Sequence, residues 1–126
     1  MAEGQVEIGI DAPLEAVWAL VGDFGAVDRY LGGIDSLRLE GDERVIGMFG
    51  MEIRERLVGR DEDAHSITYA LVGGLELERH QATITVSPDG EGVRVTWGFE
   101  VVPDEMAPIF ADTYQKGLDS LRAHFA

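Results

Sequence analysis

The chain has 126 residues, the usual size of one domain, so we expect a single domain over residues 1–126 with one hydrophobic core. It has no cysteine, which excludes disulfide bonds, thiolate nucleophiles and cysteine metal sites, and which fits a reducing compartment. With 24 acidic and 10 basic residues, the net charge of −14 disfavours nucleic acid and anionic membrane surfaces as partners. No segment approaches the roughly 20 consecutive apolar residues that span a bilayer. We therefore expect a cytoplasmic protein with no membrane insertion.

The N-terminal part of the chain predicts one strand and two short helices. Residues 3–10 alternate between apolar and polar side chains, as a half-exposed strand does. Asp11 then supplies an N-cap residue and Pro13 an early proline, and apolar residues at helical spacing follow until Gly22. Residues 24–31 predict a second short helix, which Gly32 and Gly33 end.

Residues 34–102 predict an antiparallel meander. Turn signals recur at hairpin intervals and bound six further strands. These signals are Gly41-Asp42, Gly50, Asp61-Glu62-Asp63, Gly73-Gly74 and Pro88-Asp89-Gly90. The alternation is clearest over residues 93–101, which places one face of the sheet in the core and the other in water.

Residues 104–125 predict the longest helix, with one apolar stripe that must lie on the apolar face of the sheet. The stripe consists of Met106, Ile109, Phe110, Tyr114, Leu118, Leu121 and Phe125. Gly117 lies within this helix at a cost of about 1 kcal/mol against alanine, and a close approach to the sheet is the simplest reason for it. Because a twisted seven-stranded sheet curls, a helix across it touches its two ends unequally, and an internal cavity is expected between them.

Several segments carry a family resemblance when they are taken in order. They are Ile10-Asp11-Ala12-Pro13 followed by Glu15 and Val17-Trp18, then Glu55-Arg56-Leu57, Ile67-Thr68-Tyr69, Val95-Thr96-Trp97 and residues 114–121. Nearly end to end, the chain resembles the START-like superfamily that contains the birch pollen allergen, and within it the SRPBCC or polyketide cyclase/dehydrase-like group. The resemblance implies an α+β helix-grip fold with a cavity for lipids, polyketides, phenolics or hormones. It implies no single reaction.

A looser similarity concerns two loops. In plant abscisic-acid receptors, a loop after the third strand and a turn between the fifth and sixth close over the ligand, and residues 47–50 and 73–77 match these positions here. Glycines allow a loop to change its backbone conformation, and neighbouring apolar side chains can cover the cavity, as a closing lid requires. Ordinary hairpin turns also explain the same residues. Many bacterial relatives have a basic residue in or near the third strand. This segment has Met48, Phe49 and Met51, which argues against a ligand carboxylate anchored there.

Strand parity places three polar side chains on the apolar face, Glu55, Tyr69 and His80. In a cavity they would supply a carboxylate of raised pKa, a phenol donor and an imidazole, with Trp97 as a stacking surface. Alternatively, Glu55 reaches solvent and His80 is a hydrogen-bonded core residue. The full set expected to line the cavity is Trp18, Leu31, Phe49, Ile53, Glu55, Tyr69, Leu71, His80, Trp97, Phe99, Phe110, Tyr114 and Leu118.

The sequence predicts no metal and no cofactor. None of His65, His80 and His124 has metal-ligand spacing with a partner carboxylate, and no serine lies in a nucleophile elbow. No phosphate-binding glycine loop opens a helix.

Three functions remain. We expect a binding or carrier protein for a small hydrophobic molecule, as a monomer or weak homodimer. The alternative is an aromatase/cyclase-like enzyme in which the catalytic residues are Glu55, Tyr69 and His80: Glu55 or His80 removes a proton next to a carbonyl and Tyr69 polarises the oxygen. A third possibility is that the apolar mouth of the cavity docks a protein partner.

Overall fold

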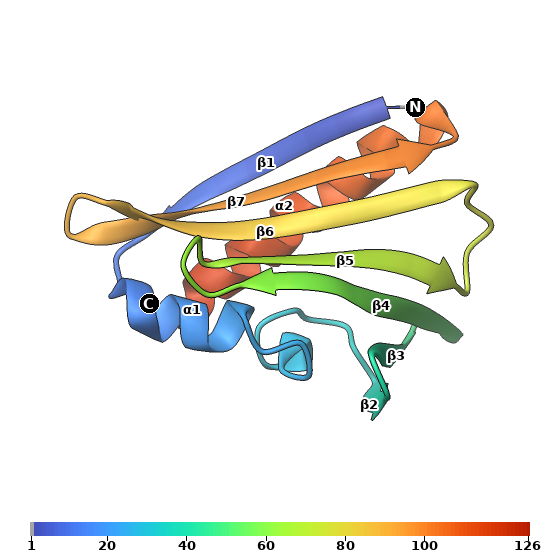
Figure 1. Cartoon of the computed structure of the whole chain (residues 1–126), viewed down its shortest axis with the longest axis horizontal. Coiled ribbons are helices and arrows are strands. Elements are labelled where there is room, and N and C mark those ends of the chain that lie inside the picture. The colour runs from blue at the N-terminus through green and yellow to red at the C-terminus, as the bar shows by residue number, and fades with distance from the viewer. Residues whose placement is uncertain (1) are drawn as a thin grey trace.

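A computed structural model describes residues 2–126 and shows a curved sheet of seven strands wrapped around one long helix (Figure 1). In chain order, the elements are β1 (Ala2–Ile10), α1 (Leu14–Val21), the 3₁₀ turn η1 (Val27–Arg29), β2 (Ser36–Glu40), β3 (Glu43–Met48), β4 (Met51–Asp61), β5 (Ser66–Gly73), β6 (Arg79–Asp89), β7 (Gly92–Val102), the 3₁₀ turn η2 (Asp104–Met106) and α2 (Ala107–His124). The predicted seven-stranded antiparallel sheet and long C-terminal helix are therefore confirmed.

The sheet has the strand order β1-β7-β6-β5-β4-β3-β2, and every neighbouring pair is antiparallel. Hairpins join the strands from β2 to β7, whereas β1 pairs with β7 from the opposite end of the chain. Figure 1 shows α2 behind the sheet, along the face that the strands curl around. The buried positions of β7 alternate along the strand, as the period of its sequence predicts.

The two predicted short helices differ from the prediction. The first begins at Leu14 and has Pro13 as its N-cap, so Asp11 does not cap it. The second, expected over residues 24–31, is only the 3₁₀ turn η1. The backbone N–H of Gly25 donates to Asp23 Oδ1 at 3.0 Å, and such a local side-chain bond offers the backbone an alternative to a helical turn.

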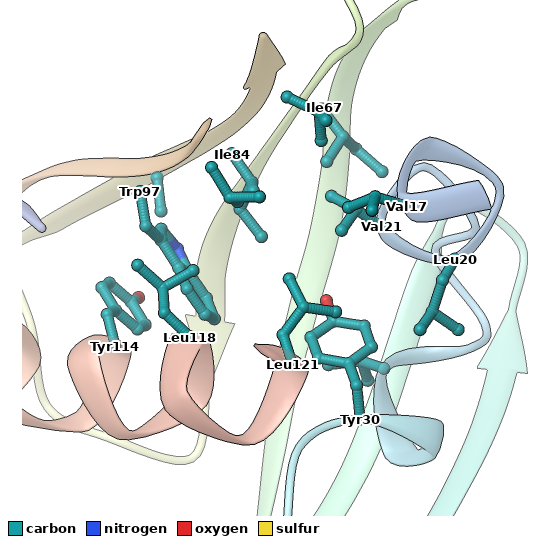
Figure 2. Close-up of a cluster of buried hydrophobic side chains, with 14 of the residues drawn as sticks. Val17, Leu20, Val21, Tyr30, Ile67, Ile84, Trp97, Tyr114, Leu118 and Leu121 are labelled. Atoms are coloured by element: carbon teal, nitrogen blue, oxygen red, sulfur yellow. The ribbon is translucent and has the colours of Figure 1, made fainter. Parts of the chain in front are cut away.

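One half of the space between α2 and the sheet is solid. Figure 2 shows Leu118 and Leu121 of α2 meeting side chains from α1 and from the sheet. Leu118, Leu121 and Val17 are at most 1% exposed. Burial of side chains of this size stabilises the fold by about 1.5–3 kcal/mol each. The C-terminal half of α2 is thus held firmly against the sheet.

Gly117 brings α2 close to the sheet, and the predicted reason for this glycine is confirmed. A Cβ atom at this position would lie 2.9 Å from Trp97 Cζ3 and 2.9 Å from Leu31 Cδ1. Real Cβ atoms essentially never approach so closely, so a larger residue at this position would force Trp97 and Leu31 to shift.

Candidate functional site

A cavity of about 280 Å³ lies between the N-terminal half of α2 and strands β3, β4, β5 and β7. Most of its wall is apolar, and its polar side chains include Arg44, Glu55, Tyr69 and Tyr114. The volume is just below the roughly 300–1,000 Å³ of typical ligand pockets. The cavity therefore has room for a molecule with one or two rings.

Irregular strand pairing shapes the cavity wall. The β4–β5 register shifts between Arg54 and Glu55 and again between Leu57 and Gly59. Such bulges bend a strand and re-aim its side chains. Pairing between β5 and β6 extends only from Ser66 to Tyr69 on the β5 side. The two strands separate beyond that point, and Figure 1 shows the gap widening toward the β5–β6 loop.

A buried ion pair forms the polar centre of the wall. Arg44 of β3 and Glu55 of β4 are directly opposite each other in the ladder. Arg44 Nε donates to Glu55 Oε1 at 2.8 Å, and Arg44 Nη2 lies 2.8 Å from the same oxygen. Arg44 is 5% exposed and Glu55 is 8% exposed. Two charges at this depth compensate each other and leave the wall electrically neutral.

Arg44 is held from further sides. Its Nη1 donates to the carbonyl oxygen of Phe24 at 3.0 Å. Its guanidinium carbon lies 4.2 Å from the centre of the Phe24 ring and 4.9 Å from that of Tyr69, so both rings contribute cation–π attraction. The arginine is therefore pre-positioned by the protein itself.

Burial raises the pKa of Glu55 above its usual value, and the charge and hydrogen bond of Arg44 oppose this shift. Burial by itself would lower the pKa of Arg44, but Glu55, Tyr69 and Tyr30 outweigh it and raise that pKa. Both close contacts of Arg44 are with Oε1 of Glu55. Oε2 of Glu55 is therefore not engaged by Arg44, and Glu55 lines the cavity.

Aromatic side chains form the wall beside this pair. The indole of Trp97 stacks on the ring of Tyr114, with 4.2 Å between centroids and 10° between planes. Trp97 Nε1 donates to the hydroxyl of Tyr69 at 3.2 Å. Burial raises the pKa of Tyr69 well above its usual value and that of Tyr114 as well, so both phenols keep their protons at neutral pH.

His80 is not on the cavity wall, in contrast to the prediction. Its Nδ1 accepts the backbone N–H of Leu71 at 3.1 Å, where the β5–β6 ladder has opened, and its Nε2 lies 2.7 Å from the hydroxyl of Tyr114. Burial lowers the pKa of His80 to about 4, so the ring is neutral at neutral pH. This placement matches the alternative interpretation of a hydrogen-bonded core histidine.

The other predicted lining residues divide into two groups. Those that line the cavity are Leu31, Phe49, Ile53, Glu55, Tyr69, Leu71, Trp97, Phe110 and Tyr114. Trp18, Phe99 and Leu118 do not. The indole of Trp18 packs on His65 and donates to Glu62, away from the cavity. Phe99 packs between Phe110 and Tyr114, and Leu118 belongs to the solid half of the core.

Sequence reasoning considered Met48, Phe49 and Met51 of this region and missed Arg44, a basic residue of β3 that lines the cavity. Parity with Ile46 and Met48 on the same strand would have placed Arg44 on the apolar face. A carboxylate expected on that face also calls for a buried cation nearby. The other missed lining residues are Val27, Ile46, Met48, Met51, Leu75, Met106, Ile109 and Thr113. Ile109, expected in the buried stripe, is 57% exposed at the mouth of the cavity.

The turn between β3 and β4 lies at the mouth. Phe49 and Gly50 have φ angles of 55° and 72°, and Met48 pairs with Met51, so residues 48–51 form a two-residue hairpin turn. This agrees with the ordinary-turn interpretation of the segment. A positive φ is unusual for a bulky residue. The side chain of Phe49 is 78% exposed, so burial of the ring does not compensate for this backbone conformation. Leu75 of the β5–β6 loop lines the same cavity.

Residues 2–126 show neither a metal-binding cluster nor a membrane-spanning helix. No group of three or more histidine and acidic side chains is arranged to hold a metal ion. No helix of that part of the chain is long and apolar enough to cross a membrane.

Solved structures share this fold. XoxI from Bacillus cereus is 27% identical, with a TM-score of 0.91 over 99% of this chain and 96% of its own. A protein from Thermobifida fusca is 30% identical, with a TM-score of 0.87 over 99% of this chain and 93% of its own. A START superfamily protein from Mycobacterium smegmatis is 14% identical, with a TM-score of 0.82 over 98% and 96% of the two chains.

The sequence carries the family assignment. No curated protein matches it in sequence. The family described as polyketide cyclase/dehydrase and lipid transport matches residues 1–126, the whole chain. The resemblance to the START-like superfamily and the helix-grip fold is thereby confirmed. The protein belongs to the polyketide cyclase/dehydrase and lipid transport family.

Proposed function

We propose that the protein binds a small hydrophobic molecule in the cavity between α2 and the sheet. The observation that carries this proposal is the wall itself, which is apolar except for a few buried polar groups whose charges cancel. Apolar burial drives binding in such a site, and the few polar groups orient the ligand. The family to which the chain belongs includes lipid transport, which supports a binding role.

The mouth supports the same function. Phe49, Met51 and Ile109 line the cavity and are 78%, 39% and 57% exposed. Exposed apolar side chains that continue into a cavity give a hydrophobic molecule a favourable path from water to the interior.

The test uses N-phenylnaphthylamine, an uncharged fluorescent probe of apolar sites. We expect saturable binding to the native protein and a raised melting temperature, because a ligand that binds only the folded state stabilises it. Leu71→Trp introduces a large ring into the cavity and should weaken binding by about tenfold or more, which corresponds to about 1.4 kcal/mol. Val72→Trp is the matched control, since Val72 is the next residue, is 42% exposed and does not line the cavity.

Two results would contradict the proposal. One is the absence of saturable binding of the probe, together with no shift in melting temperature across a panel of lipids and phenolics. The other is equal weakening by Leu71→Trp and Val72→Trp, which would place the bound probe outside the cavity.

A second candidate function is proton transfer of the cyclase type. The observation that favours it is that Glu55, a carboxyl group of raised pKa, lines the same cavity as the phenol of Tyr69. His80 would act only through Tyr114, because the tyrosine hydroxyl stands between the imidazole and the cavity. Glu55→Gln should therefore reduce turnover of a polyketide substrate by roughly a hundredfold or more, and His80→Gln by much less. Equal turnover in wild type and Glu55→Gln would exclude this role.

A further inference from the structure

The buried arginine does not present a free positive charge to the cavity. Its Nε and Nη2 both contact Oε1 of Glu55, and its Nη1 donates to the carbonyl of Phe24. A ligand carboxylate that approached Arg44 would also approach Glu55, and like charges at close range repel strongly in a low-dielectric site. The net charge of −14 adds long-range repulsion of anions. The site therefore disfavours anionic ligands although an arginine lines it.

Glu55 offers the ligand a hydrogen-bond acceptor. Oε1 is engaged by Arg44, whereas Oε2 is not, and Glu55 lines the cavity. A carboxylate oxygen accepts hydrogen bonds and, when ionised, forms stronger ones than a neutral group does. A ligand hydroxyl is the uncharged group that satisfies this oxygen best.

The pair of Tyr69 and Tyr114 offers the ligand a hydrogen-bond donor, as the directions of the surrounding hydrogen bonds show. The N–H of Leu71 can only donate, so Nδ1 of the neutral His80 ring must accept and its proton sits on Nε2. That Nε2–H donates to the hydroxyl oxygen of Tyr114 at 2.7 Å. The hydroxyl oxygen of Tyr69 likewise accepts from Trp97 Nε1. Both tyrosine oxygens thus accept a hydrogen bond from an N–H group. The two hydroxyls also share a side-chain hydrogen bond, so one O–H is engaged within the pair and the other is left to donate.

The two tyrosines stand close to the ion pair. The hydroxyls of Tyr69 and Tyr114 affect each other's pKa, and the charge of Glu55 acts on both. Tyr69 also carries the ring over which the Arg44 guanidinium lies. One wall of the cavity therefore presents an acceptor at Glu55 and one phenolic donor from the Tyr69–Tyr114 pair to the same small volume.

On this basis we propose that the cavity selects an uncharged aromatic molecule of one or two rings that carries both a hydroxyl group, which donates to Glu55, and a carbonyl oxygen, which accepts from the Tyr69–Tyr114 pair. This inference rests on the proposed function and assigns the ligand class for that same cavity. Ionic ligands such as fatty acids are disfavoured by the same wall.

The test compares ligands that share one skeleton, at neutral pH, by displacement of N-phenylnaphthylamine. Para-hydroxybenzophenone has both groups, benzophenone lacks the hydroxyl, para-benzylphenol lacks the carbonyl, and para-benzoylbenzoate replaces the hydroxyl with a carboxylate. We expect para-hydroxybenzophenone to bind about tenfold to a hundredfold more tightly than benzophenone, the range expected for one charge-assisted hydrogen bond. Para-benzylphenol should bind several-fold more weakly than para-hydroxybenzophenone, and para-benzoylbenzoate most weakly.

Glu55→Gln provides the sharpest result, because it leaves Arg44 without its counter-charge. The hydroxyl should lose its advantage, and para-benzoylbenzoate should become the tightest ligand of the series. Glu52→Gln, on the same strand with an exposed side chain that does not line the cavity, should keep the wild-type order. The double variant Tyr69→Phe/Tyr114→Phe should abolish the difference between para-hydroxybenzophenone and para-benzylphenol.

The outcomes separate this inference from the proposed function. If the probe binds and wild type prefers the carboxylate, or does not distinguish benzophenone from its hydroxy derivative, the cavity binds ligands but the proposed ligand class is overturned. If neither the probe nor any benzophenone binds, the proposed function itself fails. The wild-type ligand series decides the matter even where Glu55→Gln does not fold.

Discussion

The guanidinium of Arg44 and the carboxylate of Glu55 face each other across the β3–β4 ladder, 2.8 Å apart and almost completely buried. Neither charge is tolerable alone at this depth, because transfer of an unpaired ion from water to the interior costs several kcal/mol after relaxation (about 3–5 kcal/mol when one partner is deleted). The pair therefore links the stability of two strands to the polarity of the cavity that they line.

Removal of the arginine tests this link. Arg44→Met should lower the free energy of unfolding by about 3–5 kcal/mol, because Glu55 is left buried without a counter-charge. The double variant Arg44→Met/Glu55→Leu should recover most of the loss, and chemical denaturation measures both. Arg54→Met is the matched control, since the ion pairs of Arg54 are solvent-exposed and their loss should change the free energy of unfolding much less. Similar losses for Arg44→Met and the double variant would show that the packing of Arg44, rather than its charge, stabilises the strands.

The packing at Gly117 predicts an unusual result for a helix. At an exposed helix position, Gly→Ala stabilises by about 1 kcal/mol. At Gly117 the new methyl group meets Trp97 and Leu31 at 2.9 Å, and overpacking of this kind costs about 1–3 kcal/mol. We therefore expect a lower melting temperature for Gly117→Ala, whereas Lys116→Ala on the exposed side should change little. A stabilised Gly117→Ala variant would mean that α2 can move away from the sheet freely.

Phe49 lowers the stability of the fold but places an apolar side chain at the mouth of the cavity. An L-residue with a side chain pays about 1–2 kcal/mol to adopt the left-handed region, whereas Asn-Gly is a preferred pair for this turn. Phe49→Asn should therefore raise the free energy of unfolding by about 1 kcal/mol and weaken probe binding several-fold. Phe49→Leu keeps an apolar tip and the backbone strain, and it should change neither quantity much. If the Phe49→Asn variant binds the probe as tightly as wild type, the aromatic ring of Phe49 does not contribute to ligand binding.

The buried His80 should make the stability of the protein depend on pH. Its folded pKa of about 4 lies below the ordinary value of 6.5, so the unfolded chain binds more protons between these values. The stabilisation from neutral His80 is complete above pH 6.5 and is lost as the pH falls toward 4, by about 3 kcal/mol in total. Urea denaturation at several pH values in this range should show the free energy of unfolding rising with pH in wild type and in His124→Gln. The rise should be smaller in His80→Gln. Equal slopes in wild type and His80→Gln would contradict the assignment.

The periodicity of the sequence was a reliable guide to the elements. The two-residue period predicted the strands and the face of Glu55 and Tyr69, and the helical period predicted α2 and its contact with the sheet. It failed where local side-chain chemistry competes with the period, as at Asp23 and Gly25, where a side-chain bond replaces a helical turn.

The site was harder to predict because parity reports a face and not a position along it. Trp18, Leu118 and the ring of Phe99 share the apolar interior with the cavity wall, yet they pack in the core rather than along the cavity. His80 has the parity of a lining residue, but the opening of the β5–β6 ladder leaves an N–H of Leu71 that its ring satisfies.

The sequence by itself determined that the chain forms one curved antiparallel sheet with a long apolar-striped helix on it, since alternation and spacing depend only on neighbours along the chain. Only the tertiary structure decided that Arg44 neutralises Glu55, that Tyr114 stands between His80 and the cavity, and that one half of the interior is solid while the other is hollow. The reason is that each of these facts depends on the distance between residues on different elements. Those distances depend on strand bulges and on the close approach at Gly117, which no periodicity encodes.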